Sequence, residues 1–529
     1  MLTLHQVSYI HPNRDLLFEN INFSLQAHDK AALVGNNGVG KSSLLRIVAG
    51  ELQPIGGRVL AGTVPYDVPQ HVGQFDHLSV AGALRVEDKL AALKAMEDGR
   101  ATEADLALLN DDWLLETRCA EALAQWQLTG LALDRKMSTL SGGQKTKVFL
   151  AGISIHQPEL VLLDEPSNHL DGPARDKLYD YIRTTDNTLL VVSHDRTLLN
   201  LLDTVFELGS KGINVYGGNY DFYAAQKERE ADARDHDLKH KEKALRQAKA
   251  VERESMERKQ KLDARGKKKQ EKAGLPTISM KTFKNNAEKS KSRLKDAHTE
   301  KIGSLTHELN EIRQMLPDID KMKIDLGDTS LHTGKKWIEA QQLNYTYGGA
   351  MLWKHALSFT VHSGDRVVIR GANGSGKTTL IRMMLGELMP QTGTFFRAAL
   401  KAIYIDQDYS LIDNHATVYA QVQQFNDHKL PEHEVKTRLT RFLFTREHWD
   451  KSCAALSGGE KMRLMLCCLI IGEQAPDVII LDEPTNNLDI QNTEILTAAI
   501  QAYRGTLVIV SHDRHFLEAM NITDEIILD

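Results

Sequence analysis

The sequence predicts an α/β protein in which two phosphate-loop domains are joined by a long α-helical hairpin. Three observations lead to this prediction. A glycine-rich phosphate-binding loop occurs twice, 336 positions apart, each time between an apolar strand and a helix. The same acidic and histidine residues follow each loop in the same order. A highly charged stretch of about a hundred residues separates the two repeats. We predict the first domain at residues 1–222, the linker at 223–325 and the second domain at 326–529.

Length and composition fit a globular protein with several hydrophobic cores. The chain has 529 residues, of which 42% are hydrophobic, and this suits about three folding units. It has no apolar run long enough to cross a membrane, and its first residues lack the features of a secretion signal. We therefore expect a cytoplasmic location. The four cysteines lack metal-binding spacing, so we expect reduced packing residues rather than disulfides.

The first phosphate loop begins at Gly35 and fits the pattern G-x-x-x-x-G-K-[ST]. Residues 30–34 read as a buried strand before the loop, and residues 41–50 read as a helix that ends at a glycine. Backbone N–H groups would bind a triphosphate, Lys41 would reach its β- and γ-phosphates, and the Ser42 hydroxyl would bind Mg²⁺. The alternative is a glycine-rich turn before an ordinary helix. The predicted nucleotide-binding residues here are Gly35, Asn36, Asn37, Gly38, Val39, Gly40, Lys41, Ser42 and Ser43.

The second loop argues against that alternative, because the whole arrangement recurs. An apolar strand at residues 366–370 precedes it, a helix follows it, and Phe23 and Phe359 keep the same offset. A repeat this long indicates two copies of one domain rather than a solenoid, whose periods are shorter. The predicted residues of the second loop are Gly371, Ala372, Asn373, Gly374, Ser375, Gly376, Lys377, Thr378 and Thr379.

Other groups suited to a nucleotide site follow each loop, in the same order. A single glutamine near a strand end comes first, then a Leu-Ser-Gly-Gly turn that opens a helix and offers a second anion-binding turn. Two later strands end in Asp-Glu and in Ser-His, and in a parallel sheet all these groups gather at the carboxyl edge. In the first repeat they are Gln70, Ser141, Gly142, Gly143, Gln144, Asp164, Glu165 and His194. In the second they are Gln407, Ser457, Gly458, Gly459, Glu460, Asp482, Glu483 and His512.

This set of motifs resembles the ATP-binding cassette ATPases over residues 1–220 and about 337–529. Within that superfamily, two cassettes in one chain, a charged two-helix linker and the motifs DEPSNHLD and DEPTNNLD resemble the ABC-F proteins. The chain departs from the family pattern at Asn487, where a histidine is usual. It also has His11 where the second repeat has Tyr347, which makes adenine stacking in the first site less certain.

The resemblance implies an ATPase that uses ATP and Mg²⁺. Its cassettes would close head to tail, so that each ATP lies between the phosphate loop of one and the Leu-Ser-Gly-Gly turn, called the signature turn, of the other. It implies catalytic roles for Glu165 and Glu483, which would polarise the attacking water, and for His194 and His512, which would contact the γ-phosphate. The implied metal-binding residues are Ser42, Gln70 and Asp164 in site one, and Thr378, Gln407 and Asp482 in site two. Site one would receive Ser457, Gly459 and Glu460, and site two would receive Ser141, Gly143 and Gln144.

The linker carries a strong charge contrast. Residues 258–295 hold fourteen basic and three acidic residues, a net of +11 in a chain whose net charge is −6. This suits a polyanionic partner, but a solvated helical linker explains the charges equally well. We expect a helix over 221–265 with a weak apolar seam, breaks at Gly266 and at residues 273–276, and a return helix with an apolar seam over 302–322.

The linker tip, near residues 265–284, mixes cations with apolar side chains. Lys267, Lys268 and Lys269 suit phosphate contacts. Leu275, Ile278, Met280 and Phe283 suit contacts with bases, or they form a small cluster that packs on itself.

The resemblance also implies the partner. The linker would act on ribosomal RNA and tRNA near the peptidyl-transferase region of the ribosome, ATP would close the protein, and hydrolysis would release it from the ribosome as a monomer. Rescue of stalled translation, modulation of elongation and ribosome protection against antibiotics stay open. One rival class is a DNA-binding repair ATPase, which we disfavour because we expect no C-terminal coiled coil after Asp529. The other is the motor subunit of a transporter, which the fused cassettes and the basic hairpin disfavour.

Between Gln70 and Leu140 the first repeat is about twenty residues longer than the second is between Gln407 and Leu456. We expect amphipathic helices over residues 86–125, broken at residues 98–99 and 110–112. They would either pack as an ordinary helical subdomain or form a short arm that touches a partner.

Overall fold

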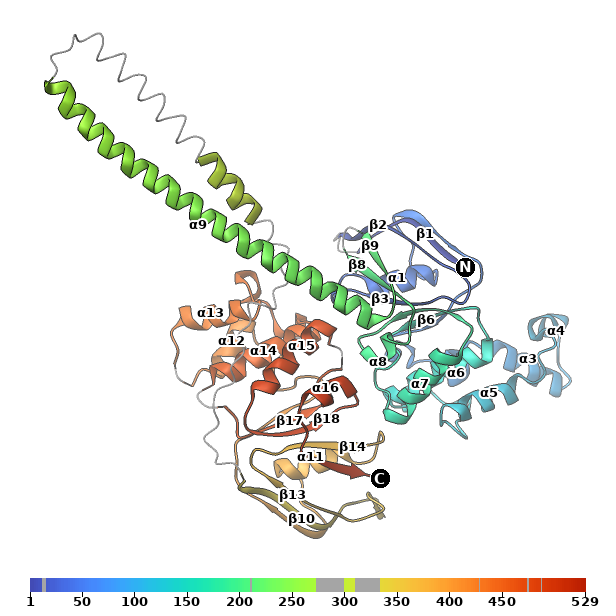
Figure 1. Ribbon diagram of the computed structural model, residues 1–529. Coiled ribbons are helices and arrows are strands. Elements are labelled where there is room, and N and C mark those ends of the chain that lie inside the picture. Colours follow the sequence, from blue (N-terminus) through green and yellow to red (C-terminus); the bar gives the residue numbers. More distant parts are fainter. Residues whose placement is uncertain are drawn as a thin grey trace. The chain divides into compact units, whose positions relative to one another are not determined.

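The computed structural model describes residues 1–11, 16–209, 212–272, 299–309, 334–427, 429–472, 475–486 and 488–529 (Figure 1). Contacts divide the chain into two compact units. One unit combines Met1–Asp221 with Lys321–Asp529, and it contains both repeats. The other is Phe222–Asp320, which is the linker.

The first repeat is built on a six-stranded sheet in the order β5-β6-β7-β3-β8-β9. All neighbouring strands are parallel except β8 and β9. Every residue of β6 and β7 is buried, as expected for parallel strands that are covered on both faces. The strands are β3 (Lys30–Val34), β5 (Tyr66–Val68), β6 (Leu160–Asp164), β7 (Thr188–Val192), β8 (Thr204–Gly209) and β9 (Gly212–Gly217).

A smaller antiparallel sheet completes the first repeat, with β1 (Leu2–Ile10) between β2 (Leu16–Leu25) and β4 (Gly56–Ala61). One hydrophobic core joins this sheet, the large sheet and helix α1 (Lys41–Val48), through residues such as Phe18, Leu33 and Leu44. Because α1 follows the phosphate loop directly, this core fixes the loop against both sheets.

The second repeat has the same architecture, which confirms the predicted duplication of one domain. Its large sheet runs β16-β17-β18-β14-β19, the order of the first five strands of the first repeat, and all its neighbouring strands are parallel. The strands are β14 (Arg366–Gly371), β16 (Ala402–Ile405), β17 (Val478–Asp482), β18 (Thr506–Val510) and β19 (Asp524–Leu528). The smaller strands are β10 (Lys336–Asn344), β11 (Thr346–Tyr347), β12 (Ala350–Met351), β13 (Leu357–His362) and β15 (Thr392–Arg397).

Helices surround each large sheet. Those of the first repeat are α2 (Val80–Ala83), α3 (Glu87–Glu97), α4 (Glu103–Leu109), α5 (Leu115–Gln125), α6 (Gly142–His156), α7 (Gly172–Thr184) and α8 (Arg196–Leu199). Those of the second are α11 (Lys377–Leu385), α12 (Val418–Gln424), α13 (Glu432–Arg441), α14 (Gly458–Ile471), α15 (Ile490–Ala502) and α16 (Arg514–Ala519). Short 3₁₀ turns occupy Val72–Phe75, Met137–Thr139, Arg446–His448 and Cys453–Ala455.

The extra residues of the first repeat form three helices, as predicted. Helices α3, α4 and α5 are separated at the predicted breaks, where Gly99, Asn110 and Asp111 adopt positive φ angles. Leu109 is buried, but Leu106 and Leu114 are 52% and 71% exposed. The predicted apolar seam is therefore only partly used for packing.

The linker begins with one helix, α9 (Tyr220–Lys272), of 53 residues. The predicted break at Gly266 is wrong, because the helix continues through it. A single internal glycine costs a helix only about 1 kcal/mol, and the surrounding lysines and glutamines are good helix formers. The described helix is therefore longer than the predicted one.

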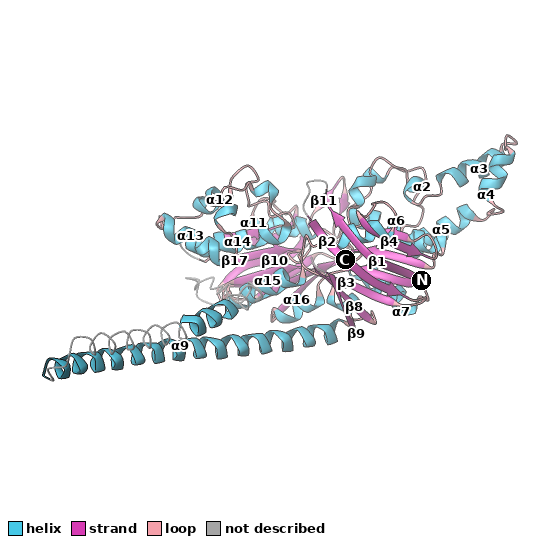
Figure 2. Cartoon of the chain, turned by 90° about the horizontal axis from the view of Figure 1, so that it is seen from above, coloured by secondary structure: helices cyan, strands magenta, loops and turns pink. Residues whose placement is uncertain are grey.

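A second linker helix, at residues 299–309, lies beside α9 (Figures 1 and 2). Lys241 Nζ is 2.8 Å from Glu308 Oε2, and Leu309 is buried. The two described helices therefore lie side by side, as the predicted hairpin requires. The predicted break at 273–276 and the apolar residues Leu275, Ile278, Met280, Phe283, Ile312, Ile319 and Met322 lie outside the described residues, as do the side chains of Lys267, Lys268 and Lys269.

All four cysteines are free and buried, as predicted. Among the helices that the structure describes, none combines the length and the hydropathy that crossing a membrane requires.

Candidate functional site

Each phosphate loop joins a strand of the large sheet to a helix whose N-terminus is left open. No described side chain caps α1 or α11, so the first N–H groups of these helices are available to an anion. Gly40 and Gly376 have φ angles of 103° and 91°, and a Cβ at either position would lie 2.6 Å from Leu17 or Leu352. Only glycine fits both the backbone and the packing there.

The two loop lysines lie over their own loops. Lys41 Nζ donates to Gly35 O at 2.7 Å, and Lys377 Nζ donates to Gly371 O at 2.8 Å. Burial lowers the pKa of both lysines, while nearby carboxylates, Glu165 and Glu483 foremost, oppose this shift. Each ammonium group thus lies close to both the carbonyl oxygens of its loop and the carboxylates at the strand ends.

The strand-end acids differ in their surroundings. Asp164 and Asp482 are the last residues of β6 and β17, and burial raises the pKa of each. In site one a hydrogen bond from Ser42 partly offsets this shift of Asp164. In site two the Tyr404 hydroxyl donates to Asp482 Oδ2 at 2.9 Å.

The next residues, Glu165 and Glu483, have strained backbones. Their φ angles are 51° and 49°, a region that non-glycine residues rarely adopt and that costs of the order of 1–3 kcal/mol. The Glu165 side chain is buried and that of Glu483 is mostly buried, and burial raises the pKa of each. Strain and burial of this kind gather at functional sites, where the fold holds a group in position.

The two histidines face these glutamates. The backbone N–H of His194 donates to Glu165 Oε2 at 3.2 Å, and His194 Nε2 lies 3.3 Å from Glu165 Oε1. In the second repeat His512 is related to Glu483 in the same way, at 3.4 and 3.5 Å. Burial lowers the pKa of His194 to about 3 and that of His512 to about 4. Both imidazoles are therefore neutral at neutral pH, and each can donate one N–H to an oxygen.

The residues present suit a nucleotide with Mg²⁺. Asp164 Oδ1 is buried without a hydrogen-bond partner among the described residues, and so is Ser375 Oγ in the second loop. Carboxylate and hydroxyl oxygens are the ligands that Mg²⁺ prefers, and lysine and open N–H groups suit phosphates. Gln70 and Gln407, each two residues beyond a strand end, are half-buried. The Mg²⁺ ligand sets of the two sites stay predictions.

The signature turns begin helices α6 and α14. Ser141 and Gln144 cap the start of α6 reciprocally, and Ser457 and Glu460 do the same for α14. Within each turn the second glycine is buried. A Cβ on Gly143 would lie 2.6 Å from His169 O and 3.1 Å from Asn373 Nδ2. The signature turn of the first repeat therefore lies next to the phosphate loop of the second.

Hydrogen bonds connect that loop to the first repeat. Asn373 Nδ2 donates to His169 O at 3.0 Å, and the Asn373 N–H donates to Asp171 Oδ2 at 3.4 Å. At site one, the carboxylate of Asp489 from the second repeat raises the pKa of Lys41 against the effect of burial. Residue 487, which departs from the family pattern, lies outside the described residues.

The two sites also differ beside the loops. Tyr347 lies next to the second phosphate-loop helix, where its hydroxyl is 3.3 Å from Thr379 Oγ1, and its ring is half exposed. His11, the residue in the corresponding place, is exposed. The second site thus offers an aromatic surface beside the loop that is larger than the imidazole of the first.

Sequence reasoning did not predict a role for Arg175. This residue of α7 is buried, its Nε donates to Leu170 O, and its charge lowers the pKa of Glu483 and of His512 across the two repeats. The equivalent position in the second repeat is Thr493. Comparing the two copies position by position could have revealed this difference, but only the structure shows that Arg175 acts on the other repeat's site.

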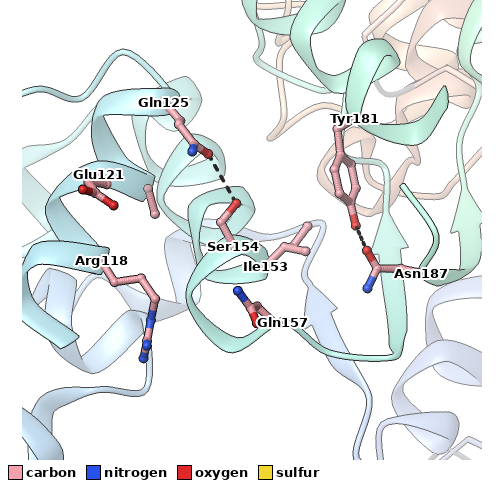
Figure 3. Close-up of a pocket in the computed structure, with 9 residues that line it drawn as sticks. Arg118, Glu121, Gln125, Ile153, Ser154, Gln157, Tyr181 and Asn187 are labelled. Carbon is pink, nitrogen blue, oxygen red and sulfur yellow. Dashed lines mark hydrogen bonds between the residues drawn. The ribbon is translucent and has the colours of Figure 1, made fainter. Parts of the chain in front are cut away.

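A separate cleft lies at the opposite edge of the first large sheet (Figure 3). Arg118, Gln125, Ser154 and Gln157 line it together with Tyr181, whose hydroxyl donates to Asn187 Oδ1. Gln157 and Asn187 precede strands β6 and β7, whereas the predicted groups Asp164 and His194 lie at or just beyond the carboxyl ends of these strands. This cleft is therefore not part of the candidate nucleotide sites.

Both repeats match the protein-family model described as ABC transporter, over residues 18–168 and 354–486. The chain is 30% identical to the probable ATP-binding protein YbiT of Escherichia coli O157:H7, over 97% of this chain and 94% of that protein. It is 28% identical to the ribosome protection protein VmlR of Bacillus subtilis, over 98% and 85% of the two chains. It is 29% identical to the energy-dependent translational throttle protein EttA of E. coli K12, over 98% and 90%.

Solved structures share the tandem fold. The archaeal ribosome recycling factor aABCE1, in its complex with the stalk protein aP1, matches with a TM-score of 0.61 at 20% identity, over 97% of this chain and 86% of that one. A structure described as RNase-L Inhibitor matches with a TM-score of 0.60 at 20% identity, over 98% and 86%. At this level of identity the likeness concerns the fold.

Proposed function

This chain belongs to the ABC-F family of ATP-binding cassette ATPases, and from that premise we propose that it acts on the ribosome in an ATP-bound, closed form. The linker hairpin would reach ribosomal RNA and tRNA near the peptidyl-transferase region, and ATP hydrolysis would release the protein. Protection against an antibiotic and modulation of translation are both compatible with this activity.

The observation that carries this proposal is the extent of the similarity. The relatives named for ribosome protection and for a translational throttle match over 98% of this chain, so the match includes the linker as well as both cassettes. The basic stretch at residues 258–295 supports contact with a polyanion. The contact of Asn373 with His169 and Asp171 supports head-to-tail pairing of the cassettes.

The proposed chemistry follows from the groups at each site. Lys41 and Lys377, with the open helix N-termini, would bind the phosphates, and Asp164 and Asp482 would hold Mg²⁺ with Ser42 and Thr378. When bound, Mg²⁺ supplies positive charge next to the phosphate that is transferred. Glu165 and Glu483 would orient the attacking water, and the neutral imidazoles of His194 and His512 would donate to the transferred phosphate. Phosphoryl transfer needs mainly such positioning and charge stabilisation.

The test uses the double variant Glu165→Gln/Glu483→Gln. The amide keeps the shape of the side chain but removes the carboxylate that orients water, so the variant should bind ATP and stay closed. We expect it to sediment with ribosomes in the presence of ATP and Mg²⁺, and to lose this association in ADP. The double variant Glu19→Gln/Glu447→Gln, at glutamates outside both sites, is the matched control and should release normally. If the first variant is found on DNA while ribosomes are bare, the repair ATPase is the better assignment.

A further inference from the structure

Helix α8 connects His194 of site one to the first turn of the linker helix α9. It starts two residues after His194, whose N–H donates to Glu165, and it ends at Leu199 with Asn200 as its C-cap. The two residues that begin α9, Tyr220 and Asp221, both contact α8 or its cap. These contacts lie within the unit that contains both cassettes.

The start of α8 is fixed firmly. Asp195 caps it, with Oδ1 accepting from the N–H groups of Thr197 and Leu198 at 3.0 and 3.2 Å. The Tyr179 hydroxyl donates to the other carboxylate oxygen at 2.5 Å. Leu198 and Leu199 are fully buried. A shift of the histidine loop would therefore move α8 as a body instead of being absorbed by a loose turn.

The end of α8 holds the linker helix by a reciprocal pair. Asn200 Nδ2 donates to Asp221 Oδ1 at 2.9 Å, and the Asp221 N–H donates to Asn200 Oδ1 at 2.9 Å. The second bond satisfies one of the N–H groups that the first turn of any helix leaves open. Asn200 thus serves as a remote cap of α9.

Arg196 adds a third connection. Its guanidinium lies 5.9 Å from the centre of the buried Tyr220 ring, within range of a cation–π contact. The same guanidinium reaches the second cassette, with Nη2 at 2.5 Å from Glu494 Oε1 and Nη1 at 3.3 Å from His515 Nε2. The Arg196 side chain therefore contacts both the first residue of α9 and the second cassette.

The second cassette repeats part of this arrangement. Arg514 occupies the place of Arg196, and its Nη2 lies 2.7 Å from Asp176 Oδ1 on α7 of the first cassette, the counterpart of Glu494 on α15. The position of Asn200 is taken by Glu518. The cross-cassette ion pairs are thus common to both copies, whereas the asparagine cap occurs where the linker helix starts.

We propose that α8 is a relay, in which Asn200 and Arg196 are positioning residues that transmit the nucleotide state of site one to the root of α9. The relay rests on the proposed function only in requiring ATP at site one. It extends that function by assigning the route through which ATP moves the linker. When ATP engages His194, α8 and the first turn of α9 move together.

The test measures how ATP changes the position of α9 in the full chain, without ribosomes. All four native cysteines are buried, so Val64→Cys and Val251→Cys, at positions 86% and 55% exposed, can carry the two spin labels. The background is Glu165→Gln/Glu483→Gln, which keeps ATP bound. Pulsed dipolar spectroscopy gives the label distance with and without ATP and Mg²⁺, and a fluorescent ATP analogue reports affinity.

The reciprocal pair allows a swap. Asn200→Asp alone brings two carboxylates together and should abolish the ATP-induced change in distance with ATP affinity unchanged. Adding Asp221→Asn again gives one amide and one carboxylate. The amide at position 221 can then donate to the carboxylate at position 200, the backbone N–H of residue 221 keeps its acceptor, and the ATP-induced change in distance should return. Glu518→Ala, at the matching position of the second cassette, should leave it intact.

The relay is refuted if the background protein shows no ATP-induced change, if Asn200→Asp keeps the full change, or if the swap does not restore it. A merely structural role of Asn200 would broaden the distances equally with and without ATP, and this outcome also refutes the relay. A protein that shows the change but never sediments with ribosomes would refute the ribosomal function and leave the relay standing.

Discussion

At the scale of single residues, the glutamates after the Asp strands combine the features expected of a catalytic base. Glu165 is buried, the side chain of Glu483 is 14% exposed, and both residues have positive φ and face a neutral histidine. Glu165→Gln and Glu483→Gln should each remove the turnover of one site. Because a positioned base contributes about 10²- to 10⁴-fold, each single variant should lose much of its steady-state phosphate release, and the double variant nearly all of it.

The measurement is phosphate release at saturating ATP, with ATP affinity measured in parallel. Affinity should be kept, since neither carboxylate is needed to bind phosphate. A double variant with wild-type turnover would show that the catalytic assignment is wrong.

Arg175 makes the two sites chemically unequal. It is a buried cation that acts on Glu483 and His512, while Thr493 takes its place toward site one. We expect Arg175→Gln to slow phosphate release several-fold when site one is silenced by Glu165→Gln, and to change it little when site two is silenced by Glu483→Gln. Arg175→Lys, which keeps the charge, should recover part of the rate, and Thr493→Val should affect neither background. Equal losses in both backgrounds would show that Arg175 only supports the fold.

The residues of each site could be predicted because they stand in fixed patterns, whereas their cross-cassette partners could not. Lys41, Asp164 and His194 each follow a recognisable strand. The contacts of Asn373 with His169 and Asp171 depend on how two distant segments meet, which spacing along the chain does not reveal.

At the scale of elements, β3, β6 and β17 coincide with the predicted strands, because each is a short apolar run before a motif. The end of α9 was misjudged because one glycine was given more weight than the helix formers around it. The helix propensity of the whole segment therefore outweighed the effect of the single residue Gly266.

The first phosphate loop allows a test of why glycine is required at position 40. In Gly40→Ala the new Cβ would meet Leu17 at 2.6 Å and the backbone would keep φ at 103°, so strain and clash combine. Gly38→Ala is the matched control, because its φ is also positive but nothing lies within 4 Å of its Cβ. The left-handed backbone alone costs about 1–2 kcal/mol. Gly40→Ala should therefore lower both the melting temperature and the affinity for ATP more than Gly38→Ala does. Equal losses in the two variants would mean that packing against Leu17 is unimportant.

At the scale of the whole molecule, the charge distribution separates the ATPase from the part proposed to touch RNA. The predicted nucleotide-binding and catalytic groups all lie in the cassettes, and the +11 segment lies in the linker. Replacing Lys267, Lys268 and Lys269 with alanine should leave ATP turnover unchanged and weaken ribosome association. Its dependence on salt should flatten by about one unit of logarithmic slope per lost phosphate contact, somewhat less for single strands.

The measurement is ribosome sedimentation across a salt series, with ATP turnover as the control. The matched variant replaces Lys227, Lys243 and Lys249, which lie in the first thirty residues of the same helix, and should keep the wild-type slope. An unchanged slope in the tip variant would show that these lysines do not contact phosphate.

The unbroken helix α9 sets a mechanical scale for the protein. Its 53 residues contain no proline and one glycine, which lies near the far end, so the segment has few places to bend. At about 1.5 Å per residue it is roughly 80 Å long, and a tilt of about 5° at its first turn would sweep the far end through roughly 7 Å. That stroke is comparable to the width of a nucleotide base. In the proposed relay such a helix would act as a lever, because a small rotation at its first turn would become a displacement at its far end that is comparable to the size of a base.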